Sequence, residues 1–314
     1  MRVVVTGGAG FIGANLCRHL SELPEVDEVV AFDNLATGFE SNLHGVDAKL
    51  VVGSILDRPV LDEVVAGADA VVHLAARPSV PRSLKDPVAS HEVNATGTLY
   101  VLEAARRAGA HVIAASSSSV YGANPALPKH EGLATRPLSP YAASKLVTEA
   151  YTLAYGTSFD LPVLSFRFFN VYGPLQAAGH AYAAVIPAFV DAALSGRPAT
   201  VFGDGTQSRD FTYVGTVCQV LGDAVIRRVT HPDAVNLAFG SRTSLLDLLD
   251  RLGAILGTPV ERTHIETRVG DVRDSQAADA RLKSLFPDVT PVPLDDGLAA
   301  TVAWFRKERT AAEG

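Results

Sequence analysis

The alternation of short β-branched runs with helical patterns constrains the fold of this chain more than any other feature. Apolar runs of strand length recur through the first half, and helical patterns lie between them at 11–23 and 93–108. The runs are RVVVTG, EVVAFD, KLVVG, DAVVHLAA and HVIAASS. Strands that alternate with helices form βαβ units, whose parallel sheet is covered on both faces. We therefore predict an α/β fold built on a doubly wound parallel sheet.

The second half of the chain loses this rhythm. A helical pattern at 141–155 and the strand LPVLSFRFF continue it, but a stretch rich in Gly and Pro, NVYGPLQAAGHAY, follows from Asn170. We predict a larger domain over 1–169, to which a segment at about 208–233 returns. The regions 170–207 and 234–314 are predicted to form a smaller, interleaved lobe that binds the substrate.

Composition excludes several kinds of partner. The net charge is −7 and no run of Lys or Arg exceeds two residues, so we expect no nucleic-acid partner. No stretch approaches eighteen apolar residues, and the chain opens directly on a strand pattern, so we expect a soluble, cytoplasmic protein without a membrane partner. Cys17 and Cys218 are predicted to be buried thiols. The nine histidines lack metal-ligand spacing, and we predict no metal site.

The segment VVVTGGAGFIG has the properties of a dinucleotide cradle. Gly7, Gly10 and Gly13 lie between a strand and a helix that begins near Phe11. Glycine permits a tight turn and close approach to a pyrophosphate, whose charge lies at the positive helix N-terminus. The next strand ends at Asp33, where a carboxylate accepts ribose hydroxyls and repels a 2′-phosphate. This combination indicates a Rossmann-like domain that binds NAD rather than NADP.

A second group of residues indicates proton transfer. Tyr141 and Lys145 are four residues apart on a predicted helix and therefore share a face. An ammonium near a phenol lowers the pKa of the phenol, which allows proton exchange near neutral pH. The serine run 116–119 follows the strand HVIAA, at the edge of a parallel sheet where ligands bind. A surface helix and a solvated serine loop are the alternative interpretations of these two motifs taken alone.

Taken together, these motifs resemble the extended short-chain dehydrogenase/reductase superfamily and, within it, the nucleotide-sugar 4-epimerases. The resemblance rests on TGGAGFIG, Asp33-Asn34, HLAA at 73–76, Asn94, SSSSVYG, Tyr141-x-x-x-Lys145, RFFNVYGP, GDGTQSRDF and RVGDVR. It extends from the first residue to about Ser275. The resemblance implies an NAD cofactor that oxidises carbon 4 of a UDP-sugar, a 4-keto intermediate that rotates, and hydride return to its other face.

The resemblance also implies roles for individual residues. Ser117, Tyr141 and Lys145 are the implied catalytic residues, and Ser119 supports Ser117. The implied cofactor-binding residues are Gly7, Gly10, Phe11, Ile12, Gly13, Asp33, Asn34, Ser54, Ile55, Leu74, Ala75, Ala76, Asn94, Tyr141 and Lys145. The implied substrate-binding residues are Ser79, Ser117, Ser119, Tyr141, Asn170, Val185, Arg209, Arg268, Asp271 and Ser275.

The identity of the sugar depends on a few positions. A small residue at Ser275 resembles the epimerases whose pocket admits an N-acetyl group, so we expect UDP-GlcNAc and UDP-GalNAc, with UDP-Glc and UDP-Gal as further substrates. UDP-glucuronate is the alternative, for which Arg82 is the available cation. A 4-ketoreductase or dehydrogenase of the same superfamily is a further alternative. Ser118-Ser119 replaces the Asp-Glu pair of the 4,6-dehydratases, which argues against dehydration.

Other positions carry smaller expectations. Ser54 stands where the family usually has an aspartate that accepts from adenine, and a neutral hydroxyl implies weaker retention of NAD. His73 is expected to pack beneath the cofactor, and Arg167 to form a structural ion pair. The apolar faces of 93–108 and 141–155 are expected either to form the helical seam of a homodimer, as in the family, or to pack within one chain.

Overall fold

The larger lobe is built on a seven-stranded sheet. In the computed structural model, which describes residues 1–178, 183–267 and 273–313, its strands lie in the order β11-β6-β5-β4-β1-β2-β3. Every neighbouring pair is parallel. The strands are β1 (Arg2–Thr6), β2 (Glu28–Asp33), β3 (Lys49–Val52), β4 (Ala70–His73), β5 (His111–Ser117), β6 (Val163–Phe168) and β11 (Val235–Leu237). The predicted α/β, doubly wound fold is confirmed.

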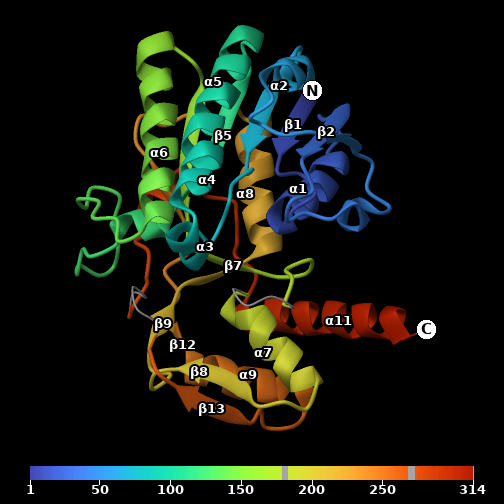
Figure 1. Cartoon of the computed structure of the whole chain (residues 1–314), viewed down its shortest axis with the longest axis vertical. Helices are drawn as coiled ribbons and strands as arrows, with labels where there is room; N and C mark the ends of the chain where they lie inside the picture. Colours follow the sequence, from blue (N-terminus) through green and yellow to red (C-terminus); the bar gives the residue numbers. More distant parts are fainter. Residues whose placement is uncertain (179–182, 268–272, 314) are drawn as a thin grey trace.

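Helices cover both faces of this sheet. One face packs against α1 (Phe11–Ser21), α8 (Val214–Ile226) and α10 (Ala280–Leu285), through buried residues such as Leu16 and Leu221. The other face packs against α2 (Arg58–Val65), α5 (Gly97–Ala108) and α6 (Pro140–Phe159), with Leu61 and Leu102 in the core. Each fully buried leucine stabilises the fold by about 1.5–3 kcal/mol. Figure 1 shows α5 and α6 side by side along one flank of the lobe.

Short helices join the main elements of this lobe. They are η1 (Glu40–Leu43), α3 (Val80–Lys85), α4 (Pro87–His91), the π-helical turn η2 (Glu92–Thr96) and η3 (Ser118–Tyr121). Ser79 caps α3 and Asp86 caps α4, and each helix has a proline in its first turn. Proline is favoured there because the missing amide hydrogen would have no partner within the helix. Ser79 has a φ of 94°, a strained value for a residue with a side chain.

In its described residues, the smaller lobe combines three helices with three two-stranded sheets. Figure 1 shows most of it below the large sheet, with α11 extending to the C-terminus. The helices are α7 (Val185–Leu194), α9 (Leu245–Leu256) and α11 (Leu294–Glu313), whose apolar faces share a core with Val201 and Phe211. The strand pairs are β7 (Asn170–Tyr172) with β10 (Phe211–Tyr213), β9 (Ser208–Arg209) with β12 (Thr243–Ser244), and β8 (Ala199–Phe202) with β13 (Arg262–Ile265).

The chain crosses between the lobes more than once. Within the expected return segment, α8 packs on the large sheet. The expected second lobe began at residue 234, whereas β11 at Val235–Leu237 pairs with β6 as an edge strand of the large sheet. The start of the return segment also differs, because β9 and β10 pair with strands of the smaller lobe, and α10, from the expected smaller lobe, packs on the large sheet. The residue ranges of the two domains otherwise remain a proposal.

Asp210 ties the crossing segments together. It is fully buried, and its carboxylate accepts hydrogen bonds from the amides of Gly240, Ser241 and Ala277 and from the Ser241 hydroxyl. Burial outweighs these bonds and raises the pKa of Asp210 to about 6. Asp210 lies within the segment GDGTQSRDF, whose sequence alone does not reveal this structural role.

Two further observations concern the described part of the chain. None of its helices is both long and apolar enough to cross a membrane, and it contains no cluster of three or more His, Cys, Asp or Glu side chains suited to a metal ion. Cys17 and Cys218 are both buried free thiols, as predicted. Burial raises the pKa of Cys17 to about 12, so this thiol stays protonated.

Candidate active site

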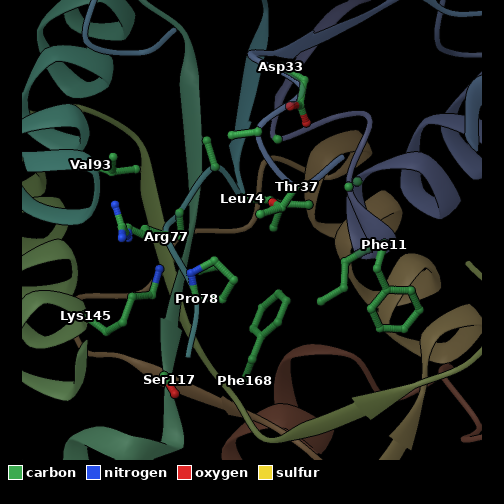
Figure 2. Close-up of a pocket in the computed structure, with 18 of the residues that line it drawn as sticks. Phe11, Asp33, Thr37, Leu74, Arg77, Pro78, Val93, Ser117, Lys145 and Phe168 are labelled. Carbon is green, nitrogen blue, oxygen red and sulfur yellow. The ribbon is translucent and has the colours of Figure 1, made fainter. Parts of the chain in front are cut away.

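A cavity of about 1260 Å³ opens at the carboxyl ends of the central strands. The strand order reverses between β4 and β1, and ligands of doubly wound sheets bind at such a switch point. Figure 2 shows Lys145 and Ser117 on one side of this main cavity and Phe11 on the other. A side cavity of about 540 Å³ lies toward the smaller lobe and shares Asn170 and Gln176 with it.

The glycine turn after β1 forms one wall of the main cavity. Gly7 has a φ of 74°, and a Cβ atom there would lie 2.8 Å from the amide nitrogen of Ala75. A Cβ atom at Gly13 would lie 2.0 Å from the carbonyl oxygen of Gly7. Gly10 precedes α1 without any side-chain cap, so the first amides of that helix remain available to an anion. The turn has the geometry that a bound pyrophosphate requires.

Asp33 and Ser54 lie farther along the same cavity. Asp33 ends β2 and is 9% exposed, and its carboxylate accepts from the amides of Ala9 at 3.0 Å and Leu35 at 2.8 Å. A carboxylate has further lone pairs that can accept from ribose hydroxyls. The Ser54 hydroxyl accepts from the amide of Leu56 at 3.2 Å. One lone pair of this neutral oxygen is therefore already used, and the hydroxyl is a weaker acceptor for an adenine amino group than a carboxylate would be.

The predicted cofactor residues therefore fit a dinucleotide as a group, with one exception. The residues of this set that line the main cavity are Gly7, Gly10, Phe11, Ile12, Gly13, Asp33, Asn34, Ser54, Ile55, Leu74, Ala75, Ala76, Tyr141 and Lys145. Asn94 does not: it is 1% exposed and lies behind the wall. Its amide bonds the main chain of Arg77 and the Ser144 hydroxyl, so it holds the wall in place rather than forming it.

The three predicted catalytic residues meet at the opposite end of the cavity. Ser117 ends β5, while Tyr141 and Lys145 occupy the first turns of α6, and all three line the cavity. The Ser83 hydroxyl, from α3, accepts the Tyr141 amide at 3.0 Å and so fixes the start of α6. Ser139 caps the helix by accepting from Ala142. The local structure thus directs a hydroxyl, a phenol and an amine into one space.

The electrostatics of this group differ from the sequence prediction in one respect. We predicted that Lys145 lowers the pKa of Tyr141, but burial raises that pKa, and contact with the Ser117 hydroxyl opposes the shift only in part. Lys145 is itself buried, which lowers its pKa to about 8. Among the described residues, no side chain pairs with its ammonium group. Its charge is therefore only partly present at mildly alkaline pH.

Two of the other serines have distinct partners. Ser119 donates from its hydroxyl to Ser117 at 2.9 Å and from its amide at 3.2 Å, in the supporting position predicted for it. Ser116 is buried and donates to Glu149 at 2.9 Å. Glu149 also binds Arg167 at 2.6 Å and 2.9 Å, which confirms the predicted structural pairing of that arginine.

The predicted substrate residues are dispersed. Asn170 lines both cavities, and Val185 and Arg209 line the side cavity. Ser79 caps α3, and Ser275 donates its amide to the Ser208 carbonyl at 3.1 Å, but neither lines either cavity. Arg268 and Asp271 lie outside the described residues.

Four residues of the cavity wall were not predicted from the sequence to bind NAD or the proposed UDP-GlcNAc substrate. Arg77, Arg82 and Lys85 line the main cavity, and Arg77 pairs with Asp86 at 3.3 Å. Gln176 lies where the two cavities meet, and its Oε1 atom is buried without a hydrogen-bond partner. The prolines near these residues conceal any helical periodicity, so residue spacing alone could not reveal that they face a cavity.

Comparison with known proteins gives a consistent result. The model of the NAD-dependent epimerase/dehydratase family matches residues 3–238. The UDP-glucose 4-epimerase of Mycolicibacterium smegmatis is 36% identical, with 98% of this chain and 99% of that protein aligned. The UDP-N-acetylglucosamine 4-epimerase of Methanobrevibacter ruminantium, solved with UDP-N-acetylmuramic acid, is 32% identical with a TM-score of 0.92, covering 98% of each chain.

A third protein extends the comparison to an acidic sugar. The UDP-glucuronic acid 4-epimerase of Bacillus cereus, solved with UDP-glucuronic acid and NAD, is 29% identical with a TM-score of 0.89 and covers 98% of this chain and 100% of that one. A Rossmann-like sheet with a serine at its carboxyl edge, and a tyrosine and a lysine on the helix beside it, defines a nucleotide-dependent enzyme of the short-chain dehydrogenase/reductase type. This chain belongs to the NAD-dependent epimerase/dehydratase family, and its cofactor is NAD.

Proposed function

We propose that the protein is an isomerase, a UDP-sugar 4-epimerase that works through a 4-keto sugar on NAD. The observation that carries this proposal is the meeting of Ser117, Tyr141 and Lys145 in the same cavity as the glycine turn. A site with both a dinucleotide cradle and a proton-transfer group can remove and restore hydrogen at one carbon.

The protein residues perform the proton transfer. NAD⁺, when bound, supplies the oxidant that accepts and returns the hydrogen of carbon 4. Tyr141 takes the proton of the carbon 4 hydroxyl and later gives it back. Ser117 accepts two hydrogen bonds from Ser119, so its own hydrogen is directed to the Tyr141 oxygen or the sugar oxygen. We propose that the Lys145 ammonium, which lines the same cavity, favours the ionised phenol. Burial alone disfavours that form of Tyr141.

For the substrate, we propose UDP-GlcNAc and UDP-GalNAc, with UDP-Glc and UDP-Gal as further substrates. One observation supports this choice: Val185 lines the side cavity within a stretch that resembles the N-acetylhexosamine epimerases. Ser275 lines neither cavity, so its small size lends no support. A structural relative with 32% identity is itself a UDP-N-acetylglucosamine 4-epimerase. The roles of Arg209, Arg268, Asp271 and Asn170 toward the diphosphate and ribose remain part of this proposal.

A proton NMR time course tests the proposal. The purified protein is incubated with UDP-GlcNAc, UDP-Glc or UDP-glucuronate, first without and then with added NAD. We expect conversion of UDP-GlcNAc to UDP-GalNAc, and Tyr141→Phe should reduce turnover by about 10³-fold while the UDP-sugar still binds. Conversion that consumes NAD in stoichiometric amounts and accumulates NADH would instead indicate a net dehydrogenase.

UDP-glucuronate is the second candidate because of Arg82. This arginine lines the main cavity and, within the part of the chain that the structure describes, its guanidinium has no ion-pair partner. An arginine binds a carboxylate in a bidentate manner. If UDP-glucuronate is the substrate, Arg82→Leu should raise its KM at least tenfold and leave UDP-GlcNAc turnover unchanged. An equal loss with both sugars would contradict the carboxylate role.

Two further proposals concern assembly and location. We propose a cytoplasmic homodimer whose seam includes the face of α6, where Tyr151 is 40% and Phe159 is 52% exposed. Exposed aromatic side chains on one helix are typical of an interface. Light scattering should give twice the mass of 33.0 kDa, and Tyr151→Lys should lower it toward the monomer value. A monomeric wild-type protein at micromolar concentration would contradict the dimer.

A further inference from the structure

The buried histidine at the end of β4 contacts two hydroxyl side chains, one on strand β1 just before the cofactor turn and one on helix α5. His73 is 2% exposed and is the parallel-sheet partner of Thr6, the residue before the glycine turn. Its Nδ1 atom lies 2.8 Å from the Thr6 hydroxyl, and its Nε2 atom lies 3.0 Å from the Thr98 hydroxyl. No proton-transfer role in the proposed reaction requires this residue.

The Thr6 side of the ring leads to the cofactor cradle. The Thr6 hydroxyl accepts from the amide of Ala75 at 3.3 Å. The nitrogen of that same amide would lie 2.8 Å from a Cβ atom at Gly7. The Thr6 hydroxyl therefore holds the segment that follows β4 against the glycine turn. Any change in this contact alters the wall that faces the dinucleotide.

The Thr98 side leads to the helix that carries Tyr141 and Lys145. The Thr98 hydroxyl donates to the carbonyl of Asn94 at 2.6 Å, and Thr148 of α6 donates to the same carbonyl at 2.7 Å. The Asn94 side chain in turn donates to Ser144, the neighbour of Lys145, at 2.9 Å. His73 is therefore three hydrogen bonds from the catalytic turn of α6.

The groups at the two ends of this series of hydrogen bonds, the Ala75 amide and the Asn94 carbonyl, indicate where its protons lie. With the Thr98 hydrogen at the Asn94 carbonyl, the shortest of its contacts at 2.6 Å, Nε2 carries a hydrogen and donates to Thr98. The Thr6 hydroxyl accepts from the Ala75 amide and still has its own hydrogen to donate to Nδ1, which completes the same arrangement. The Thr98 end thus favours the neutral Nε2–H tautomer, and the Thr6 end is compatible with it. Burial, with a smaller contribution from Lys145, also lowers the pKa of His73 to about 3.

We propose that His73 is a positioning residue: as the neutral Nε2–H tautomer, it joins the cofactor turn, through Thr6, to the Tyr141–Lys145 helix, through Thr98. It sets the spacing between the NAD cradle and the proton-transfer group. The part of this inference that concerns turnover rests on the proposed function, whereas the parts that concern the tautomer and NAD affinity do not.

Replacing His73 with asparagine or with glutamine tests the two sides of the ring one at a time. An asparagine amide reaches the Nδ1 position and a glutamine amide reaches the Nε2 position. His73→Asn retains an acceptor for Thr6 and loses the donor to Thr98, so we expect NAD affinity within threefold of wild type and kcat reduced about tenfold. His73→Gln retains the donor and loses the acceptor, so we expect NAD affinity reduced about tenfold and kcat at saturating NAD within threefold.

Two isosteric substitutions serve as matched controls. Thr98→Val should reproduce His73→Asn, and Thr6→Val should reproduce His73→Gln, because each removes the hydroxyl on one side only. If all four variants change NAD affinity and kcat by equal factors that follow their loss of thermal stability, the positioning role is wrong and the residue is merely structural.

The tautomer itself is measured on the unmutated protein. Nitrogen-15 NMR of histidine-labelled protein, with the His73 signals assigned by their loss in His73→Gln, should show a neutral ring protonated at Nε2 from pH 6 to 8. A ring protonated at Nδ1, or one that titrates in this range, would overturn the proposal. This measurement needs neither bound NAD nor turnover, so it stands even if no UDP-sugar is converted.

Discussion

Lys145 and Glu149 are one turn apart on α6 and are almost equally buried, at 4% exposure each, but their surroundings differ. Glu149 receives two hydrogen bonds from Arg167 and one from Ser116. Lys145 points into the main cavity, and no described side chain pairs with its ammonium (Figure 2). The buried charge of Glu149 is neutralised by Arg167, whereas no counter-ion offsets the desolvation of the Lys145 ammonium.

This difference distinguishes a structural site from a functional one. A buried charge without a partner destabilises the fold, so it is retained where a ligand or reaction needs it. A paired charge with its hydrogen bonds satisfied does not require a ligand. On this argument Glu149–Arg167 supports the sheet beneath the site, and Lys145 acts within it.

Breaking the paired site should produce the largest change in stability. Glu149→Gln leaves the Arg167 guanidinium buried without its counter-ion, so we expect the free energy of unfolding to fall by about 3–5 kcal/mol. Urea denaturation at pH 7 measures this. The double variant Glu149→Leu, Arg167→Met should recover most of the loss, and a single variant as stable as wild type would contradict the assignment of this pair.

Removing the unpaired charge of Lys145 should increase the free energy of unfolding instead of lowering it. Lys145→Met eliminates a buried ammonium that has no partner, so we expect the protein without cofactor to gain about 1–3 kcal/mol of unfolding free energy while turnover is lost. The same denaturation series measures the gain. A destabilised Lys145→Met protein would show that the lysine is paired in solution.

The pH dependence of that gain follows from the pKa of Lys145. The folded-state pKa of about 8 lies below the unfolded value of 10.5, so the unfolded chain binds more protons between these values. Wild-type stability should therefore rise relative to Lys145→Met as pH increases from 8 to 10.5. Unfolding curves of both proteins across this range test it, and a stability difference independent of pH would contradict the depressed pKa.

The smallest effect is expected from removing the hydroxyl of Ser119, which supports Ser117. Ser119→Ala removes the hydroxyl that donates to Ser117 at 2.9 Å but leaves the amide bond, so we expect kcat to fall about three- to tenfold with stability unchanged. Steady-state kinetics measure this, with Ser118→Ala as the matched control. If both alanine variants reduce kcat equally, Ser119 has no specific role in directing Ser117.

Local patterns allowed much of this site to be predicted. The alternation of strands and helices determines the sheet, and spacing within a single turn or helix places Gly7 near Gly13 and Tyr141 near Lys145. Contacts between distant segments could not be predicted. Arg167 was expected to pair, but its partner Glu149 lies 18 residues away on another element. Nothing in the sequence indicated that Asn94 lies behind the cavity wall or that Ser275 lies outside both cavities.

The most direct test of the proposed reaction follows the hydrogen on carbon 4. The protein is incubated in ordinary water with UDP-GlcNAc and, in parallel, UDP-Glc, each carrying deuterium at carbon 4, and the products are analysed by NMR and mass spectrometry. We predict that the 4-epimer retains the deuterium at carbon 4 without hydrogen from solvent. Loss of the label to water, or its transfer to carbon 6, would contradict redox-neutral epimerisation at this site.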